Sequence, residues 1–312
     1  MDTTQKNQWS ITKYEQDTHL LTWIEAFLVD RKSQGMAKGT LYFYQKKLKL
    51  FIDFCEAQVI TDIADITPSF LRNYMLYLEE TGHNDGGRHA CYRALKTFLY
   101  WWEEELEPQG WTNPIRKVKP PRLSISPLEP ADLEDIKTMI DRCDNSFYGK
   151  RDKAILLSLL DTGTRAHEFL ALNIDDFDYK TGEILIREGK GRKFRSVFLG
   201  KKSRRIVRVY LRTRRDEGNS FWITKGGERL TYWGLREIIR RCATRAEVKI
   251  PTIHSFRRAF ALNMLRAGVD IFSLQKLMGH ADLQVLRRYL AQTTEDIAQA
   301  HRLGSPVDNY NI

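Results

Sequence analysis

The chain has 312 residues, of which 42% are hydrophobic and 29% are charged, and its formal net charge is +10. This length allows one large domain or two ordinary ones with hydrophobic cores, and the lack of any eighteen-residue apolar run excludes a helical membrane span. The positive charge favours a polyanionic partner, because each Lys or Arg that neutralises a phosphate releases counterions.

The first part of the chain is predicted to be a small helical bundle. Residues 1–17 are polar and lack the apolar segment of a signal peptide, so we expect an N-terminal tail there. Apolar side chains then recur at helical spacing in three segments, residues 20–31, 39–58 and 88–106. We expect Trp101 and Trp102 to be core residues of this bundle rather than surfaces for base stacking.

A further helix lies between the second and third of these segments, and the sequence indicates both of its ends. Thr67 is a candidate N-cap, Pro68 suits the first helical position, and Gly82 is a candidate stop. Four helices in one short stretch are typical of a helical bundle, which we place over residues 18–112.

A proline-rich segment follows the bundle. Five of the nine prolines lie between Asn113 and Pro130. Such a segment is extended and stiff, so we expect a linker over residues 113–125. Its positive side chains predict that it lies along a phosphate backbone, and they are Arg116, Lys117, Lys119 and Arg122.

The second part of the chain is predicted to be mostly α-helical with a small antiparallel β-sheet. Two apolar stretches around a Gly-Lys-Gly tip predict a strand–turn–strand over residues 183–199. Helical patterns cover residues 131–142, 150–160, 201–214, 232–245, 255–267 and 271–278.

The positive charge is concentrated within this second part. Residues 187–215 contain thirteen Lys or Arg and a single acid, Glu188. A charge run is often only a solvated helix face. A run of one sign repels itself unless an anion compensates it, which favours a nucleic acid as the partner.

Two short patterns carry candidate chemistry. Arg165 is expected in the first turn of a helix, where a cation opposes the helix dipole unless something anionic offsets it. Glu168 could be that anion, in which case the pair is only a local ion pair. His254 and Arg257 share a helix face, although such a pair alone is ordinary on a protein surface.

A third pattern lies near the C-terminus. Gly279 is a candidate helix stop and Asp282 is a candidate N-cap, so His280 is expected in the turn between two helices. In one continuous helix His280 and Tyr289 would face opposite sides, whereas the break allows both to face one site. A tyrosine at position 289 is also typical of half-buried packing with its hydroxyl in water. The geometry alone does not decide whether Tyr289 is such a packing residue or a nucleophile.

Taken together, five motifs in this order resemble the tyrosine recombinase (phage integrase) family, and the size of the chain resembles its Xer-like members. The motifs are "TGTRAHEFLAL" with Arg165 and Glu168, "GKGRKFRSVFL" with Lys190, "HSFRRAFA" with His254 and Arg257, "LMGHADL" with His280, and "VLRRYL" with Tyr289. The sequence departs from the family at Arg258, where histidine is frequent, and in residues 285–288, which are not threonine-rich.

The resemblance implies a two-domain protein that closes as a clamp around double-stranded DNA. The helical bundle over residues 18–112 would be the core-binding domain, joined by the basic linker to an α+β catalytic domain over residues 126–304. Residues 305–312 would be a C-terminal tail. The expected activity is site-specific recombination by a metal-independent DNA strand transferase, with neither a metal nor a cofactor.

The resemblance also implies a role for each motif residue. Tyr289 would be the nucleophile that forms a 3′-phosphotyrosyl link, and Arg165, Arg257 and His280 would stabilise the negative charge that develops on the phosphate. His254 is the candidate base and Lys190 the candidate acid, while Glu168 would orient an arginine. The residues expected to contact DNA are Arg116, Lys117, Lys119, Arg122, Arg192, Lys193, Arg195 and Arg258.

The expected assembly is a homotetramer on two core sites that exchanges strands through a Holliday junction, with an accessory or directionality protein as a further candidate partner. Two alternatives are a catalytically inactive DNA-binding protein on the same fold and a type IB topoisomerase. The four cysteines are widely spaced and form no CxxC pair, so we expect no disulfide framework and a cytoplasmic, nucleoid-associated protein.

Overall fold

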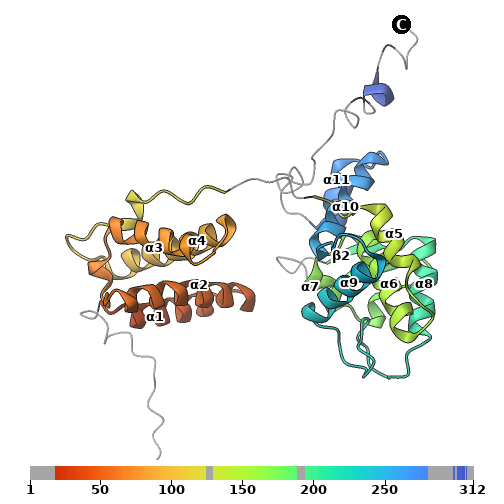
Figure 1. The fold of residues 1–312 in the computed structure, drawn as a ribbon, viewed down its shortest axis with the longest axis horizontal. Helices are drawn as coiled ribbons and strands as arrows, with labels where there is room; N and C mark the ends of the chain where they lie inside the picture. The colour runs from red at the N-terminus through yellow and green to blue at the C-terminus, as the bar shows by residue number, and fades with distance from the viewer. Residues whose placement is uncertain are drawn as a thin grey trace, which may run out of the picture. The chain divides into compact units, whose positions relative to one another are not determined.

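The computed structural model describes residues 18–123, 129–187 and 194–279 and, near the end of the chain, residues 298, 301–305 and 307. The chain divides into two compact units, Met1–Ile125 and Ser126–Ile312 (Figure 1). Each unit has a hydrophobic core of its own, so each is described by itself. Among the described residues, no helix is both long enough and apolar enough to cross a membrane.

The first unit contains the four predicted helices. They are α1 (Leu20–Ser33), α2 (Lys38–Ala57), α3 (Pro68–Glu80) and α4 (Asp85–Leu106), with a short 3-10 turn, η2 (Ile63–Asp65), before α3. The side chain of Thr67 accepts a hydrogen bond from Phe70 N at 3.1 Å, which confirms the predicted N-cap of α3. The α4 helix begins three residues before its predicted start, because Asn84 caps it by accepting a hydrogen bond from Gly87 N.

Aromatic side chains form much of the core of the first unit. The ring of Trp23 lies 6.1 Å from that of Trp101 and 6.4 Å from that of Trp102. Phe27 also contacts Trp101, at 5.3 Å between ring centroids. Trp101 and Trp102 are therefore core residues, as predicted, and they hold α4 against α1.

The predicted linker begins later than expected. Asn113 is fully buried and donates a hydrogen bond to Leu99 O at 3.1 Å, and it is followed by a 3-10 turn, η3 (Pro114–Lys117). Ile115 and Val118 belong to the core of the first unit, and Tyr92 Oη donates to Val118 O at 2.8 Å. An extended linker was therefore the wrong prediction for residues 113–118, because two apolar side chains three residues apart bury themselves against the bundle. Residues 119–123 have no regular secondary structure.

The second unit is helical with one antiparallel hairpin. Its elements are α5 (Leu133–Asp141), α6 (Phe147–Thr162), α7 (Ala166–Ala171), a 3-10 turn η4 (Ile174–Asp176), β1 (Glu183–Ile186), β2 (Arg195–Phe198), α8 (Lys201–Leu211), α9 (Tyr232–Ala246), α10 (Ile253–Arg266) and α11 (Ile271–Met278). Glu183 pairs with Phe198 and Ile186 pairs with Arg195, which confirms the two predicted strands and their antiparallel pairing. The hairpin tip, residues 188–193, lies outside the described residues. The predicted fold class, mostly α with a small antiparallel sheet, is confirmed.

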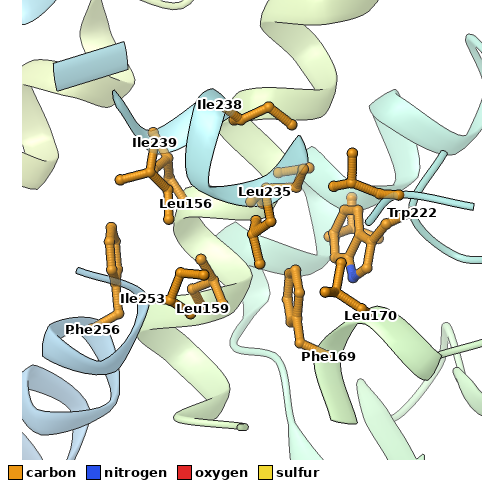
Figure 2. Close-up of a cluster of buried hydrophobic side chains, with 14 of the residues drawn as sticks. Leu156, Leu159, Phe169, Leu170, Trp222, Leu235, Ile238, Ile239, Ile253 and Phe256 are labelled. Carbon is orange, nitrogen blue, oxygen red and sulfur yellow. The ribbon is translucent and has the colours of Figure 1, made fainter. Parts of the chain in front are cut away.

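The α6 helix is the centre of the second unit. It packs against α5, α8, α9 and α10, and Figure 2 shows its side chains Leu156 and Leu159 among those of α9, α10 and the α7 region. The ring of Trp222 stacks on that of Phe169 with centroids 4.8 Å apart. This core fixes the C-terminal end of α6, the start of α7 and one face of α10, and these are the elements that carry the predicted motifs.

Candidate active site

The turn between α6 and α7 places the first motif. Gly163 ends α6 in the left-handed conformation, with φ of 56°, and a Cβ atom at this position would clash with the ring of Phe260. Arg165 is the N-cap of α7 rather than a residue of its first turn. Its backbone N donates to Glu168 Oε2 at 2.9 Å, and its Nη1 donates to Glu168 Oε1 at 2.9 Å. Glu168 therefore both caps α7 and forms the local ion pair considered from the sequence.

Glu168 is a buried carboxylate with two arginine partners. Its side chain has no exposed surface, and Arg195 binds both of its oxygens, at 2.9 Å and 2.7 Å. Burial alone would raise the pKa of Glu168. The hydrogen bonds from Arg195 and from the backbone of Arg165, together with both positive charges, outweigh burial and lower that pKa to about 2. Glu168 is therefore ionised at neutral pH and fixes both guanidinium groups.

Arg195 has partners inside the protein at each of its three guanidinium nitrogens. Besides its two bonds to Glu168, its Nε donates to Leu277 O at 2.9 Å, and 11% of its side chain is exposed. Arg195 was predicted to contact DNA. The structure places it between Glu168 and the end of α11, with all three guanidinium nitrogens bound to protein acceptors.

Three arginines converge on the last carbonyl groups of α11. Arg195 binds Leu277 O, Arg257 Nη2 donates to Met278 O at 2.7 Å, and Arg165 Nη2 donates to Gly279 O at 3.0 Å. Arg165 Nη1 also approaches Met278 O, at 3.5 Å. The carbonyl end of a helix carries partial negative charge, so it attracts these cations.

This convergence fixes where the last motif begins. Arg257 is 1% exposed and also donates to Gly163 O at 2.6 Å, so it ties the end of α6 to the end of α11. Gly279 ends α11 with φ of 61°, as predicted for a helix stop. Arg165 and Arg257 thus meet directly before His280 in the chain. His280 and Tyr289 themselves lie outside the described residues.

His254 lies one turn before Arg257 near the start of α10, at the protein surface. Partial burial lowers the pKa of its imidazole, and the positive charges of Arg257, Arg258 and Arg165 lower it further. His254 is therefore neutral at pH 7 and can accept a proton. Arg165 and Arg257, which both bind the end of α11, are thus among the cations that lower the pKa of His254.

The remaining predicted residues fall into three groups. Arg258 was expected to contact DNA, but it is 7% exposed and its Nε donates to His254 O at 3.4 Å, so little of it can reach a ligand. Lys190, Arg192 and Lys193 lie outside the described residues. The four predicted cations of the first unit are all exposed, and Arg116 among them contacts Glu103 at 3.0 Å; they are Arg116, Lys117, Lys119 and Arg122.

The sequence contains a signal for the inward orientation of Arg195, although Arg195 lies in a segment rich in other cations. Side chains two residues apart in a strand point to the same face, and Val197 is fully buried. Arg195 therefore points toward the protein interior, where a buried cation needs an acidic partner. The strand alternation thus distinguishes Arg195 from the other cations of this segment.

The family model that matches this chain is that of the phage integrase family, over residues 131–296. The match covers more than half of the chain and all five motifs identified in the sequence. The chain belongs to the phage integrase family. Among similar proteins, tyrosine recombinase XerC of Oceanobacillus iheyensis is 28% identical over 309 residues, which cover 95% of this chain and 98% of that protein. Tyrosine recombinase XerA of Thermococcus kodakarensis is 25% identical over 280 residues, which cover 89% and 93%.

Solved structures of this family share the fold. The Tn1549 transposon integrase, in complex with a circular intermediate DNA, has a TM-score of 0.74 at 16% identity, over 92% of this chain and 99% of that one. A lambda integrase fragment, a dimer bound to a COC′ core site, has a TM-score of 0.69 at 14% identity, over 85% and 96%. The predicted family and enzyme class, a Xer-like tyrosine site-specific recombinase, are confirmed.

Proposed function

We propose that this recombinase cuts and rejoins DNA at paired core sites through a 3′-phosphotyrosyl link at Tyr289. The observation that supports this most is the convergence of Arg165 and Arg257 at the end of α11, directly before His280. Guanidinium groups present several N–H donors in a planar fork that suits phosphate oxygens. The solved structures support DNA as the substrate, since one integrase of the same fold is in complex with a circular intermediate DNA and another is bound to a core site.

In the proposed reaction, the Tyr289 hydroxyl oxygen attacks the phosphorus of the scissile phosphodiester. His254 accepts the tyrosine proton, because its lowered pKa keeps it neutral. The bond between phosphorus and the 5′ oxygen breaks, and Lys190 gives a proton to that oxygen. Rejoining is the reverse reaction with the 5′ hydroxyl of another strand, so the energy of the broken bond is kept in the phosphotyrosyl link.

The negative charge of the transition state is offset by fixed cations. Arg165, Arg257 and His280 would donate hydrogen bonds to the non-bridging phosphate oxygens. Glu168 and Arg195 do not touch the substrate in this scheme. They are positioning residues, because Glu168 holds Arg165 while Arg195 holds both Glu168 and the end of α11.

The proposed assembly is a tetramer on two core sites, acting on the nucleoid and exchanging strands in pairs through a Holliday junction. The first unit would be the core-binding domain and the second the catalytic domain of a clamp around duplex DNA. The exposed cations Arg116, Lys117, Lys119 and Arg122 support this assignment, because they lie at the end of the first unit where the chain leaves it.

The function can be tested with a library of DNA sequences, from which the protein itself selects its site. Incubating the protein with randomised duplexes that carry one nick, and recovering detergent-resistant protein–DNA complexes, should enrich one core sequence. Two labelled duplexes with that sequence should then exchange strands, and the rate should rise steeply with protein concentration. Relaxation of supercoiled DNA at a rate proportional to protein concentration, without strand exchange, would instead indicate a topoisomerase.

A pH profile tests the proposed role of His254. Because its pKa is lowered, the rate of strand cleavage should stay constant as the pH falls below 7 and decrease only below the usual histidine pKa of about 6.5. Arg258→Met removes one of the charges that lower this pKa, so the decrease should begin at a higher pH. Single-turnover cleavage of the nicked core duplex gives both profiles. If the cleavage rate of the two proteins began to decrease at the same pH, His254 would be excluded as the base.

A further inference from the structure

The exposed face of α8 carries a straight row of positive side chains. At 100° per residue, Lys201, Arg205, Arg208 and Arg212 lie within about 60° of one another around the helix axis. Lys201 and Arg212 are separated by about 16 Å along that axis, so a cation occurs roughly every 5 Å. All four side chains are exposed. We call these four residues the α8 row.

The protein core fixes the direction in which the row points. The opposite face of α8 is buried through Ser203, Val207 and Tyr210. Tyr210 Oη donates to Phe221 O at 3.1 Å and accepts from Ile223 N at 3.2 Å. These contacts prevent α8 from rotating, so the row is held rigidly toward solvent.

The row lacks acidic compensation within the part of the chain that the structure describes. Residues 201–215 contain no Asp or Glu, and none of the four cations of the row has an ion pair among the described residues. Arg214, by contrast, is paired with Asp216 at 2.5 Å and does not belong to the row. Since like charges at this spacing repel one another, the row is stabilised when it binds an anion.

A second segment adds to the same surface. Tyr179 and Lys180, which precede β1, line a shallow depression together with Lys201, Arg204, Arg205 and Arg208. Arg204 Nη1 donates to Lys180 O at 2.6 Å, which attaches this turn to α8. Tyr179 is 37% exposed, so it adds a hydroxyl donor beside the cations.

The row lies apart from the candidate active site. The α6 helix packs against α8 and against α10, and Figure 1 shows α6 between α7 and α8, with α8 at the outer edge of the unit. The side chains that converge on the end of α11 come from the α6–α7 turn, β2 and α10. The row and the residues of the candidate active site therefore belong to different elements of the unit.

We propose that the α8 row binds the phosphate backbone of duplex DNA outside the segment that is held for cleavage. Its spacing is of the same order as that of phosphates along a DNA strand. An interface with an acidic protein would need an apolar centre, and Val209, at 39%, is the one large hydrophobic side chain of α8 that is well exposed. The row thus fits a long, regular polyanion, and in a synapse it would hold flanking DNA.

The test compares two triple variants that lose the same charge. The first, Arg205→Gln, Arg208→Gln and Arg212→Gln, neutralises most of the row. The control, Lys137→Gln, Arg240→Gln and Lys249→Gln, removes surface cations that are already paired with Glu134, Glu237 and Glu129. Fluorescence anisotropy measures binding to a duplex of unrelated sequence over a range of salt concentrations, and thermal melts show that both variants are folded.

The logarithm of the binding constant decreases with the logarithm of salt concentration, and we expect the steepness of this decrease to be smaller by about 2.7 in the row variant, or 0.9 for each lost phosphate contact. The control should change the steepness by less than about 0.9, the value for one contact. Both variants should cleave a nicked core duplex at the wild-type rate when the DNA is saturated with protein. Equal slopes in the two variants, or a row variant that loses heparin binding while keeping DNA binding, would overturn the proposal. Because binding is read without cleavage, failure of the Tyr289 mechanism would leave this result unaffected.

Discussion

Replacing Arg257 by lysine should slow strand cleavage about a hundred- to thousandfold, the usual effect of removing one fixed donor from a site that stabilises developing charge. Lysine keeps the positive charge but loses the fork with which Arg257 binds both Gly163 O and Met278 O. Both the donor to the phosphate and the tie between α6 and α11 are lost. Single-turnover cleavage of a nicked core duplex, at saturating protein, measures this rate.

Arg151→Lys is the matched control for Arg257→Lys. Arg151 is also a buried arginine, 4% exposed, but it lies near the start of α6 and binds Asp152 and Ile223 O. Both substitutions should lower the melting temperature, whereas Arg151→Lys should leave the cleavage rate of the folded protein unchanged. Equal slowing by both would mean that Arg257 acts only through stability.

Replacing Arg195 by methionine should lower the free energy of unfolding by about 3 kcal/mol, because it leaves a buried carboxylate with one arginine partner instead of two. Glu168 has no exposed side-chain surface, and Arg165, its remaining partner, is 23% exposed. Urea denaturation measures the loss. Adding Glu168→Gln to Arg195→Met should restore part of the stability, since a buried amide needs no cation, but it should not restore cleavage.

The pH dependence of this loss is a second test of Arg195. The pKa of Glu168 is about 2 in the folded protein and 4.5 as its ordinary value, so its ion pairs stabilise the fold fully above pH 4.5 and lose their effect as the pH falls toward 2. The stability difference between the wild type and Arg195→Met should therefore narrow over that range. A difference that stays constant with pH would show that Arg195 contributes packing rather than charge.

Much of the fold could be predicted because its signals are local. The helical spacing of α1 and α2 and the Thr67–Pro68 start of α3 depend on residues within a few positions of one another. The predicted start of α4 was three residues too late, because Gly86 and Gly87 are poor helix formers. The helix nevertheless includes both glycines, since Asn84 caps its N-terminus. Residues 113–118 were misjudged because their prolines and charges obscured Ile115 and Val118, whose burial depends on contacts with the bundle.

The candidate site could be predicted as a set of residues but not as an arrangement. The family motifs indicate Arg165, Glu168, His254 and Arg257, and the structure brings these residues together. Their meeting point, the end of α11, joins groups that are far apart in sequence, since Arg165 and Gly279 are separated by 114 positions. Arg195 and Arg258 share a basic neighbourhood with surface cations. The strand alternation indicates which way Arg195 points, but its partners Glu168 and Leu277 O, and the burial of Arg258, depend on tertiary packing.

The identity of the nucleophile is tested most directly by trapping the enzyme on a nicked core duplex, where the short cleaved strand diffuses away and rejoining cannot occur. Wild-type protein and Tyr310→Phe, a control for a second tyrosine near the C-terminus, should both form a detergent-resistant complex. Mass spectrometry of the digested complex should place the DNA on Tyr289, and Tyr289→Phe should form no complex. A covalent complex with Tyr289→Phe, or DNA attached to any other residue, would contradict the proposed mechanism.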